Sequence, residues 1–169
     1  MKATRLVTTL SGMVAVALVL ASFLVAVAAA QTAHNHVAGN LSDARWGPAP
    51  PMLPPGAQIA VLTGDPTKAA FYTVRLKFPA NYDIPAHSHP TDEHVAVVSG
   101  ELFMGLGDKL DRKTGMGLSV GGFGLAPAGV NHFAYTKNET TILLYGTGPV
   151  EVKYVNPSDD PRTRTVTKR

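Results

Sequence analysis

Two short segments hold most of the residues that could do chemistry in this chain of 169 residues. The first contains His87, His89 and Glu93, and the second, residues 121–132, ends at His132. Three imidazoles and one carboxylate form a ligand set for a divalent transition metal, because nitrogen and oxygen donors at about 2 Å suit such ions. We therefore expect one Mn, Fe, Zn, Ni or Cu ion to be bound by these four side chains.

The local pattern predicts how the first segment positions its ligands. Residues two apart on a strand face the same side, so His87 and His89 are expected to project together. Residues 90–92 read as a tight turn that returns the chain as an antiparallel neighbour, with Glu93 beside the histidines at about 5 Å. His94 should then face away, and a slip of one residue would exchange it with Glu93.

The elements that carry these ligands are predicted to be short strands. From Gln58 onward, apolar segments alternate with turn residues, and no stretch shows a helical period. Residues 71–78 alternate most clearly, with Tyr72 and Phe78 on the same face. An all-β sandwich or small barrel is the fold that such a series favours. The expected strands are residues 58–62, 71–78, 84–89, 93–98, 101–106, 123–126, 131–136, 140–145 and 150–155.

At these residues the chain resembles a cupin, a double-stranded β-helix of the jelly-roll type. The first cupin motif is G-(x)5-HxH-(x)3,4-E-(x)6-G, and the chain matches it from His87 to Gly100. The second motif is G-(x)5-PxG-(x)2-H-(x)3-N, and the chain matches it from Gly121 to His132. The resemblance, which covers about residues 58–155, implies the fold and the metal ligands.

Two positions depart from the cupin motifs. Asn81 stands where the first glycine is expected, and asparagine tolerates a positive φ better than other side chains. Thr136 stands where the last asparagine is expected. That asparagine is not usually a ligand in the family, so its replacement concerns the geometry of the strand end rather than the metal.

The segments outside the barrel are assigned from their composition. Residues 1–30 read as a cleaved signal peptide, with a basic start, an apolar run over 13–27 and alanines before Gln31, although an uncleaved anchor is the alternative. Cleavage predicts an exported, periplasmic or secreted protein without stable membrane insertion. Residues 31–57 are expected to form an extended, proline-rich arm over the domain surface, and residues 156–169 a basic, disordered tail.

Composition limits the partners. The chain has no cysteine, so packing, a bound metal and a homodimer interface are the sources of stability to consider. Residues 31–161 carry 9 basic and 12 acidic side chains, and no basic stripe is interleaved with aromatic residues. We therefore expect no nucleic-acid binding, and a small molecule as the substrate or ligand.

Function follows less directly than fold. The resemblance favours an oxygenase or oxidase acting on a small molecule, although cupins also include many other enzymes. The alternatives are a non-catalytic module that binds a small ligand or metal, and a metal-free barrel that mediates oligomeric interactions. Because only neutral imidazole coordinates, metal binding should be lost steeply below about pH 6. The candidate pocket residues, each of which could instead be plain core, are Tyr72, Phe78, Met104, Phe133 and Tyr135.

Overall fold

The computed structural model describes residues 37–163, which form two antiparallel β-sheets and three short 3-10 helices. The unit that begins at Gly39 contains all of these elements. The six-stranded sheet has the order β1 (Gly47–Pro48), β2 (Gln58–Thr63), β3 (Phe71–Phe78), β10 (Thr140–Thr147), β5 (Glu93–Ser99), β8 (Phe123–Ala126). The five-stranded sheet has the order β11 (Lys153–Tyr154), β4 (Asp83–Ser88), β9 (His132–Thr136), β6 (Leu102–Leu106), β7 (Met116–Leu118).

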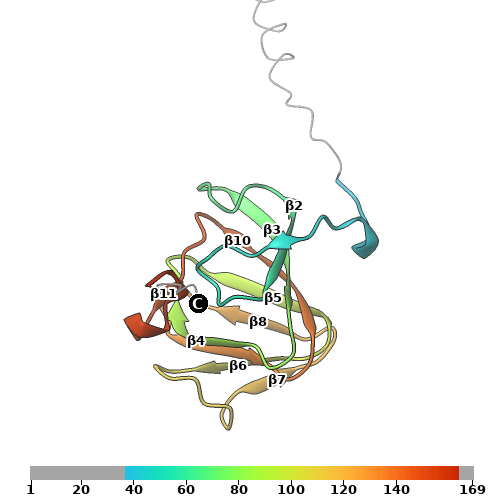
Figure 1. Ribbon diagram of the computed structural model, residues 1–169. Helices are drawn as coiled ribbons and strands as arrows, with labels where there is room; N and C mark the ends of the chain where they lie inside the picture. Colours follow the sequence, from blue (N-terminus) through green and yellow to red (C-terminus); the bar gives the residue numbers. More distant parts are fainter. Residues whose placement is uncertain (1–36, 164–169) are drawn as a thin grey trace, which may run out of the picture. The chain divides into compact units, whose positions relative to one another are not determined.

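The two sheets face each other and enclose one apolar core, so the predicted jelly-roll barrel is confirmed (Figure 1). Alternation on β3 positions Tyr72, Val74, Leu76 and Phe78 inward, where each is at most 6% exposed. β-Branched and aromatic side chains favour such pleated, half-buried strands. The inward residues of β3, β5 and β10 pack against those of β4, β6 and β9.

The predicted hairpin between the two halves of the first motif does not form. β4 pairs with β9 and β11, whereas β5 pairs with β10 and β8. Residues 89–92 therefore cross from one sheet to the other instead of joining neighbouring strands. The reason is topological, because β4 and β5 belong to opposite sheets, and a local pattern cannot distinguish such a crossing from a hairpin. As a result Glu93 faces the histidines across the barrel interior.

A second apolar cluster lies on the outer side of the five-stranded sheet. It is formed by Phe103, Phe133 and Tyr135, with Leu110 from the β6–β7 connection packed against it. The rings of Phe103 and Tyr135 stack with centroids 4.7 Å apart, and the Tyr135 hydroxyl donates to the carbonyl oxygen of Arg112 at 2.9 Å. All five residues of β9 are consequently buried, the even-numbered ones by the barrel interior and the odd-numbered ones by this cluster.

The proline-rich arm enters the barrel instead of lying only over its surface. Gly47 and Pro48 pair with β2 as an edge strand, and the chain then loops back toward β11, as the blue-green trace of Figure 1 shows. Prolines leave no alternating pattern from which an inward face could be predicted. Trp46 lies under the Lys77 ammonium group, which is 4.5 Å from the ring centroid.

The end of the described chain is more ordered than the composition predicts. Pro157–Asp159 (η2) and Pro161–Thr163 (η3) are 3-10 helices, like Leu41–Asp43 (η1) near the start. Arg162 explains the order, because its guanidinium binds Asp160 and donates to the carbonyl oxygen of Val152 at 2.8 Å. The expected disorder therefore does not apply to residues 156–163. The predicted signal peptide, its predicted cleavage site and the last six residues lie outside the described residues.

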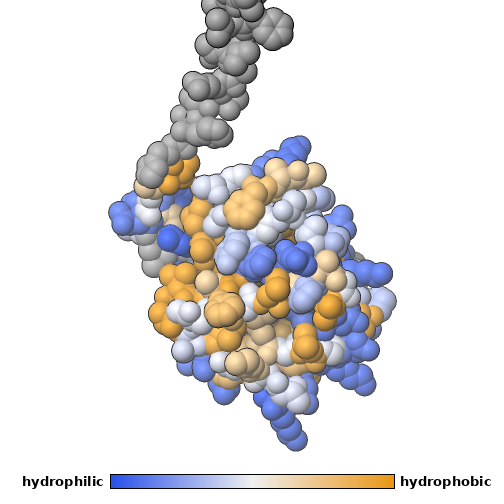
Figure 2. Space-filling model, turned by 180° about the vertical axis from the view of Figure 1, so that it is seen from behind, coloured by the Kyte–Doolittle hydropathy of each residue, from blue (hydrophilic) through white to orange (hydrophobic). Residues whose placement is uncertain are grey.

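The surface exposes several large apolar side chains. Figure 2 shows apolar groups among hydrophilic ones on the face turned away from the view of Figure 1. In residues 37–163, no helix has the length and apolar character needed to span a bilayer. The most exposed of these apolar side chains are Phe123, Leu106, Met116, Val120, Val37 and Phe71.

Candidate metal centre

Three histidines from separate parts of the fold meet at one point inside the barrel. His87 on β4 lies directly opposite His132 on β9, and His89 follows β4 at the start of the crossing. Their ligand nitrogens all lie within 4.8 Å of one another, and the three side chains are 3% to 6% exposed. Metal–nitrogen bonds are about 2.0–2.1 Å long, so small inward shifts let one ion contact all three.

Backbone carbonyls fix the orientation of all three imidazole rings. Nδ1 of His87 lies 2.7 Å from the carbonyl oxygen of Pro85, and Nδ1 of His89 lies 2.7 Å from that of Glu151. Nδ1 of His132 lies 3.1 Å from the carbonyl oxygen of Val130. A carbonyl oxygen only accepts, so each Nδ1 must carry a proton, and in the neutral ring the lone pair is then on Nε2. This is the tautomer that coordinates a metal through Nε2.

Glu93 approaches the group from the opposite sheet. Its Oε2 lies 3.4 Å from Nε2 of His89, which is longer than an ordinary N–H···O hydrogen bond. The buried Nε2 of His89 consequently has no well-formed hydrogen-bond partner among the described residues. A buried nitrogen without a partner is costly unless a further group binds it, and a metal ion would satisfy this requirement.

The pKa values of the three histidines are shifted in different directions. Burial, together with the neighbouring His132 and His89, lowers the pKa of His87 to about 3. Burial also lowers the pKa of His132. Burial opposes the charge on His89 too, but the hydrogen-bonding and charge effects of Glu93 outweigh it and raise the pKa of His89. The pKa of Glu93 is lowered, because contact with the histidines outweighs its burial, so the carboxylate is ionised.

The turn before His132 docks against the first motif. Gly129 has a φ of 73°, a left-handed conformation that favours glycine, and its N–H donates to the carbonyl oxygen of His89 at 2.8 Å. The Asp92 carboxylate accepts from the N–H of Ala128 at 2.8 Å. Asp92 thus stabilises the turn at residues 127–130, and this turn ties the second motif to the crossing that carries His89.

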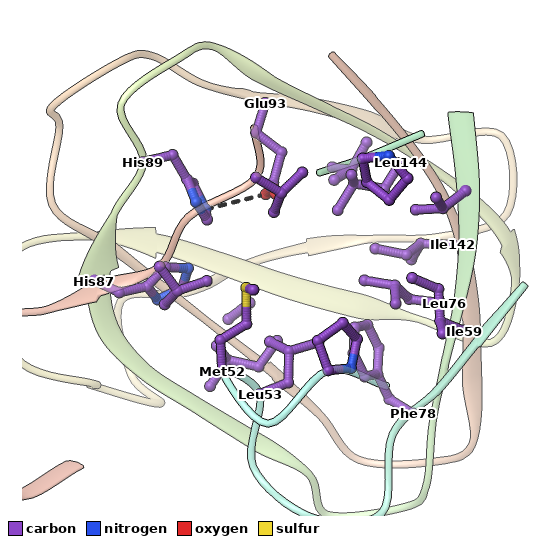
Figure 3. A pocket seen from close by; sticks show the side chains of 18 of the residues that line it. Met52, Leu53, Ile59, Leu76, Phe78, His87, His89, Glu93, Ile142 and Leu144 are labelled. Carbon is purple, nitrogen blue, oxygen red and sulfur yellow. Dashed lines mark ion pairs between the residues drawn. The ribbon is translucent and has the colours of Figure 1, made fainter. Parts of the chain in front are cut away.

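The three histidines and Glu93 line an apolar cavity with a volume of about 120 Å³. Figure 3 shows His87, His89 and Glu93 at one end and Ile142, Leu76 and Phe78 at the other. Among the predicted pocket residues, Tyr72, Phe78 and Met104 line this cavity. Phe133 and Tyr135 do not, because they alternate with His132 on β9 and face the outer cluster. The predicted register of β5 holds, since Glu93 lines the cavity while His94 stacks on Tyr145.

The comparison with known families decides the assignment. Residues 33–151 match the model of the ChrR cupin-like domain, which is well over half of the chain. The chain belongs to this cupin family. A search of curated protein sequences gives no significant match.

Solved structures confirm the cupin fold. The polyketide cyclase RemF from Streptomyces resistomycificus is 18% identical with a TM-score of 0.58, over 75% of this chain and 90% of the other. A putative acetylacetone dioxygenase from Methylibium petroleiphilum is 17% identical with a TM-score of 0.58, over 78% and 88%. An RmlC-like cupin from Shewanella frigidimarina is 15% identical with a TM-score of 0.52, over 67% and 90%. At such identities the likeness shows the fold alone.

The two departures from the cupin motifs meet in space. Asn81 has a φ of 57°, so it adopts the left-handed turn in which the motif has glycine. The Thr136 hydroxyl accepts from the N–H of Tyr82 at 3.2 Å and donates to the carbonyl oxygen of Pro79 at 2.8 Å. Thr136 thus binds both sides of the Asn81 turn, and the strand end keeps its geometry without the motif asparagine.

The sequence analysis of this cupin did not predict that Tyr72, Gly146 and Glu93 lie side by side on neighbouring strands of the six-stranded sheet. Gly146 on β10 pairs with Tyr72 on one side and Glu93 on the other. A Cβ at Gly146 would lie 3.5 Å from the Tyr72 hydroxyl and 2.8 Å from the carbonyl oxygen of Asp92. Burial, together with the charge of Glu93, raises the pKa of Tyr72, so its hydroxyl stays protonated. The cavity therefore offers a carboxylate and a neutral hydroxyl near each other.

Proposed function

We propose that this cupin binds one divalent transition metal through His87, His89 and His132, and acts with it as an oxygenase or oxidase on a small, largely apolar molecule. One observation carries the proposal: three imidazoles, each oriented by a backbone carbonyl at Nδ1, direct their Nε2 atoms into a buried apolar cavity. A bound ion supplies Lewis acidity or, when it is redox-active, electrons for dioxygen.

The three histidines, Glu93 and Tyr72 each have a role in this proposal. The three histidines hold the ion in orientations that the backbone sets. Glu93 serves as the fourth ligand or as a charge beside the ion, and its lowered pKa keeps it anionic. The Tyr72 hydroxyl is a hydrogen-bond donor for a polar atom of the substrate. The apolar remainder of the wall excludes water, which strengthens the electrostatic interactions inside.

A non-catalytic binding module is the second candidate. The observation that favours it is the small number of further polar groups: of the 23 side chains that line the cavity, only the histidines, Glu93, Tyr72 and Thr67 are polar. A site with so few acid–base groups can hold a ligand without transforming it. The two candidates differ in one measurable property, since only the oxygenase or oxidase converts the bound small molecule.

The deciding experiment combines metal analysis with oxygen uptake. Protein purified from its native compartment should contain one transition metal per chain, identified by elemental analysis. Reconstituted protein should then consume oxygen with at least one substrate from a panel of small diones, phenols and enols. The paired variant His87→Ala and His89→Ala should lack both metal and uptake. Tight binding of a panel member without uptake would favour the binding module, and protein without any metal would contradict the metal-dependent oxygenase or oxidase.

We also propose that the protein is exported and that its mature chain begins at Gln31. The basic start, the apolar run and the three alanines at 28–30 support this. Intact-mass measurement of the exported protein tests it, and a full-length product held in the membrane would contradict it. A homodimer stays a prediction, which sedimentation of the exported protein would check.

A further inference from the structure

Part of the cavity wall comes from residues 49–57 of the proline-rich arm, and this segment is called the arm below. Pro50, Met52 and Leu53 line the same cavity as the three histidines. Figure 3 shows Met52 next to His87, with Leu53 beside it toward Phe78. The arm therefore contacts the space that a ligand of the metal centre would occupy, and of its two labelled side chains Met52 lies nearer to His87 in Figure 3.

The arm is held firmly in place. The Tyr154 hydroxyl donates to the carbonyl oxygen of Met52 at 2.8 Å, and the Tyr82 hydroxyl donates to that of Pro54. Within the arm, Leu53 N–H donates to the carbonyl oxygen of Pro50 at 3.0 Å, closing a turn. Four prolines also restrict φ, so little conformational freedom is left to lose on ligand binding. The arm is a preformed wall.

Tyr154 connects this wall to the metal centre. It pairs with His87 across β11 and β4, and the two rings lie 5.9 Å apart. Because the same tyrosine holds the Met52 carbonyl, the Met52 backbone is fixed relative to His87. The side chain is half-buried and lies against the cavity. Its bulk therefore takes up room beside the imidazoles, where the first atoms of a metal-bound ligand would extend.

We propose that Met52 is a specificity-determining residue: it limits the width of the ligand next to the histidines, so that unbranched molecules bind and molecules branched beside their coordinating group are excluded. The inference rests on the proposed function, because it requires a small molecule at the metal. The length of the ligand is limited instead by Phe78, Leu76 and Ile142 at the other end of the cavity. A cavity of about 150 Å³ holds benzene, so about 120 Å³ leaves little room for an extra branch.

The test uses the full chain loaded with cobalt(II), whose visible absorption reports ligand binding without any need for turnover. Butanoate and 2,2-dimethylbutanoate are titrated as an unbranched and a branched carboxylate. In the unaltered protein butanoate should bind at least about tenfold more tightly, since one misplaced methyl group in a pocket costs that much or more. Met52→Ala should tighten binding of the branched acid by about tenfold and change butanoate binding far less.

Matched variants separate the effect of the Met52 side chain on ligand affinity from general effects of losing a side chain. Met116→Ala removes the same side chain from β7, where it is 70% exposed and outside the cavity, and should leave both affinities unchanged. Met52→Leu keeps the bulk and should keep the discrimination. Tyr154→Phe removes the hydroxyl that holds the Met52 carbonyl and should weaken the discrimination in the same direction as Met52→Ala. Thermal unfolding and cobalt affinity confirm that each variant is folded and loaded.

The outcomes distinguish the inference from the proposed function. An unchanged ratio of the two affinities in Met52→Ala, with butanoate still bound, would overturn the role of Met52 alone. An equal shift in Met116→Ala would overturn it as well, because the effect would not come from the cavity wall. Failure of the cobalt-loaded protein to bind either acid would overturn the small-molecule site itself, and the inference with it.

Discussion

At the scale of single residues, the site depends on which ring nitrogen of each histidine is hydrogen-bonded to a backbone carbonyl. Nδ1 of His87, His89 and His132 contacts a carbonyl oxygen, which leaves three Nε2 atoms directed inward. His94 belongs to the same motif but stacks on Tyr145, with the ring planes 8° apart, on the other side of β5.

The double substitution of His87→Ala and His89→Ala is therefore expected to abolish metal binding. Two of three imidazole ligands are lost, and His132 with Glu93 cannot hold the ion alone. His94→Ala should bind metal with an affinity close to that of the unaltered protein. Elemental analysis after dialysis against a defined metal measures both. Loss of metal in His94→Ala, with retention in Glu93→Ala, would show that the register of β5 in solution differs by one residue.

Thr136→Val is expected to lower the free energy of unfolding by about 1–3 kcal/mol, because it leaves the Tyr82 N–H and the Pro79 carbonyl without their shared partner. Valine keeps the shape, so the loss reports the hydroxyl. Thr136→Ser, which retains the hydroxyl, should lose less than Thr136→Val. Urea denaturation of the metal-free proteins measures the difference, and equal losses for the two variants would assign the effect to packing.

At the scale of elements, alternation along a strand could be predicted where both faces have distinct chemistry. The inward set on β3 and the opposite orientations of Glu93 and His94 follow from a period of two. The same period applied to β9 excludes Phe133 and Tyr135 from the cavity once His132 faces inward. Phe133 and Tyr135 are candidate pocket residues only because they are close to His132 in the sequence, and the alternation along the strand does not support them. All of β9 is buried, so hydrophobicity alone could not show the two faces.

Two other features could not be predicted from local patterns. The crossing at residues 89–92 looks like a hairpin turn, because the sheet to which a strand belongs is decided by long-range packing. The inward position of Met52 depends on hydrogen bonds from Tyr82 and Tyr154, which are distant in the chain. A prolyl segment has no hydrophobic period that would reveal such contacts.

Tyr135→Ala is expected to destabilise the fold by about 3–5 kcal/mol, because the side chain is 1% exposed and stacks on Phe103 in the outer cluster. Metal affinity, measured well below the unfolding temperature, should stay close to that of the unaltered protein. Tyr135→Phe loses only the hydrogen bond to Arg112 and should cost about 1 kcal/mol. A large loss of metal affinity in folded Tyr135→Ala would mean that the outer cluster positions His132.

At the scale of the whole molecule, the buried histidines link stability to pH. The pKa of His87 is about 3 and that of His132 is lowered, both chiefly by burial, whereas the unfolded chain has ordinary values near 6.5. The unfolded state therefore binds more protons below pH 6.5, and the stability from these groups is lost as pH falls. His89 acts in the opposite direction, since its pKa is raised and its stabilising effect is lost as pH rises through the folded value.

We therefore expect the metal-free protein to lose stability between about pH 6.5 and pH 4, by up to about 1.4 kcal/mol per pH unit for each histidine with a lowered pKa. His89 offsets part of this loss. Urea denaturation of chelator-treated protein across this range measures the slope. A free energy of unfolding that does not change with pH would show that His87 and His132 are accessible to protons in the folded state.

The structure also changes the expected pH dependence of metal binding. From the ligand types alone, protons should compete for all three histidines and metal binding should be lost steeply below about pH 6. Because His87 and His132 resist protonation, His89 is the ligand for which protons compete first, so the loss should follow about one proton per metal. Competition titrations with a chelator at several pH values measure this slope. A slope near three would show that all three imidazoles titrate together.

The three carbonyl groups that orient the imidazoles belong to Pro85, Val130 and Glu151, and all are main-chain atoms. Every amino acid carries such a carbonyl, so exchanging the side chains at these positions would preserve the ring orientations as long as the backbone keeps its path. The cavity wall has no such protection, because its shape depends on side-chain bulk. Related chains could thus diverge widely in what they accept while keeping the same metal geometry, and their ligand preference would be inherited separately from their metal site.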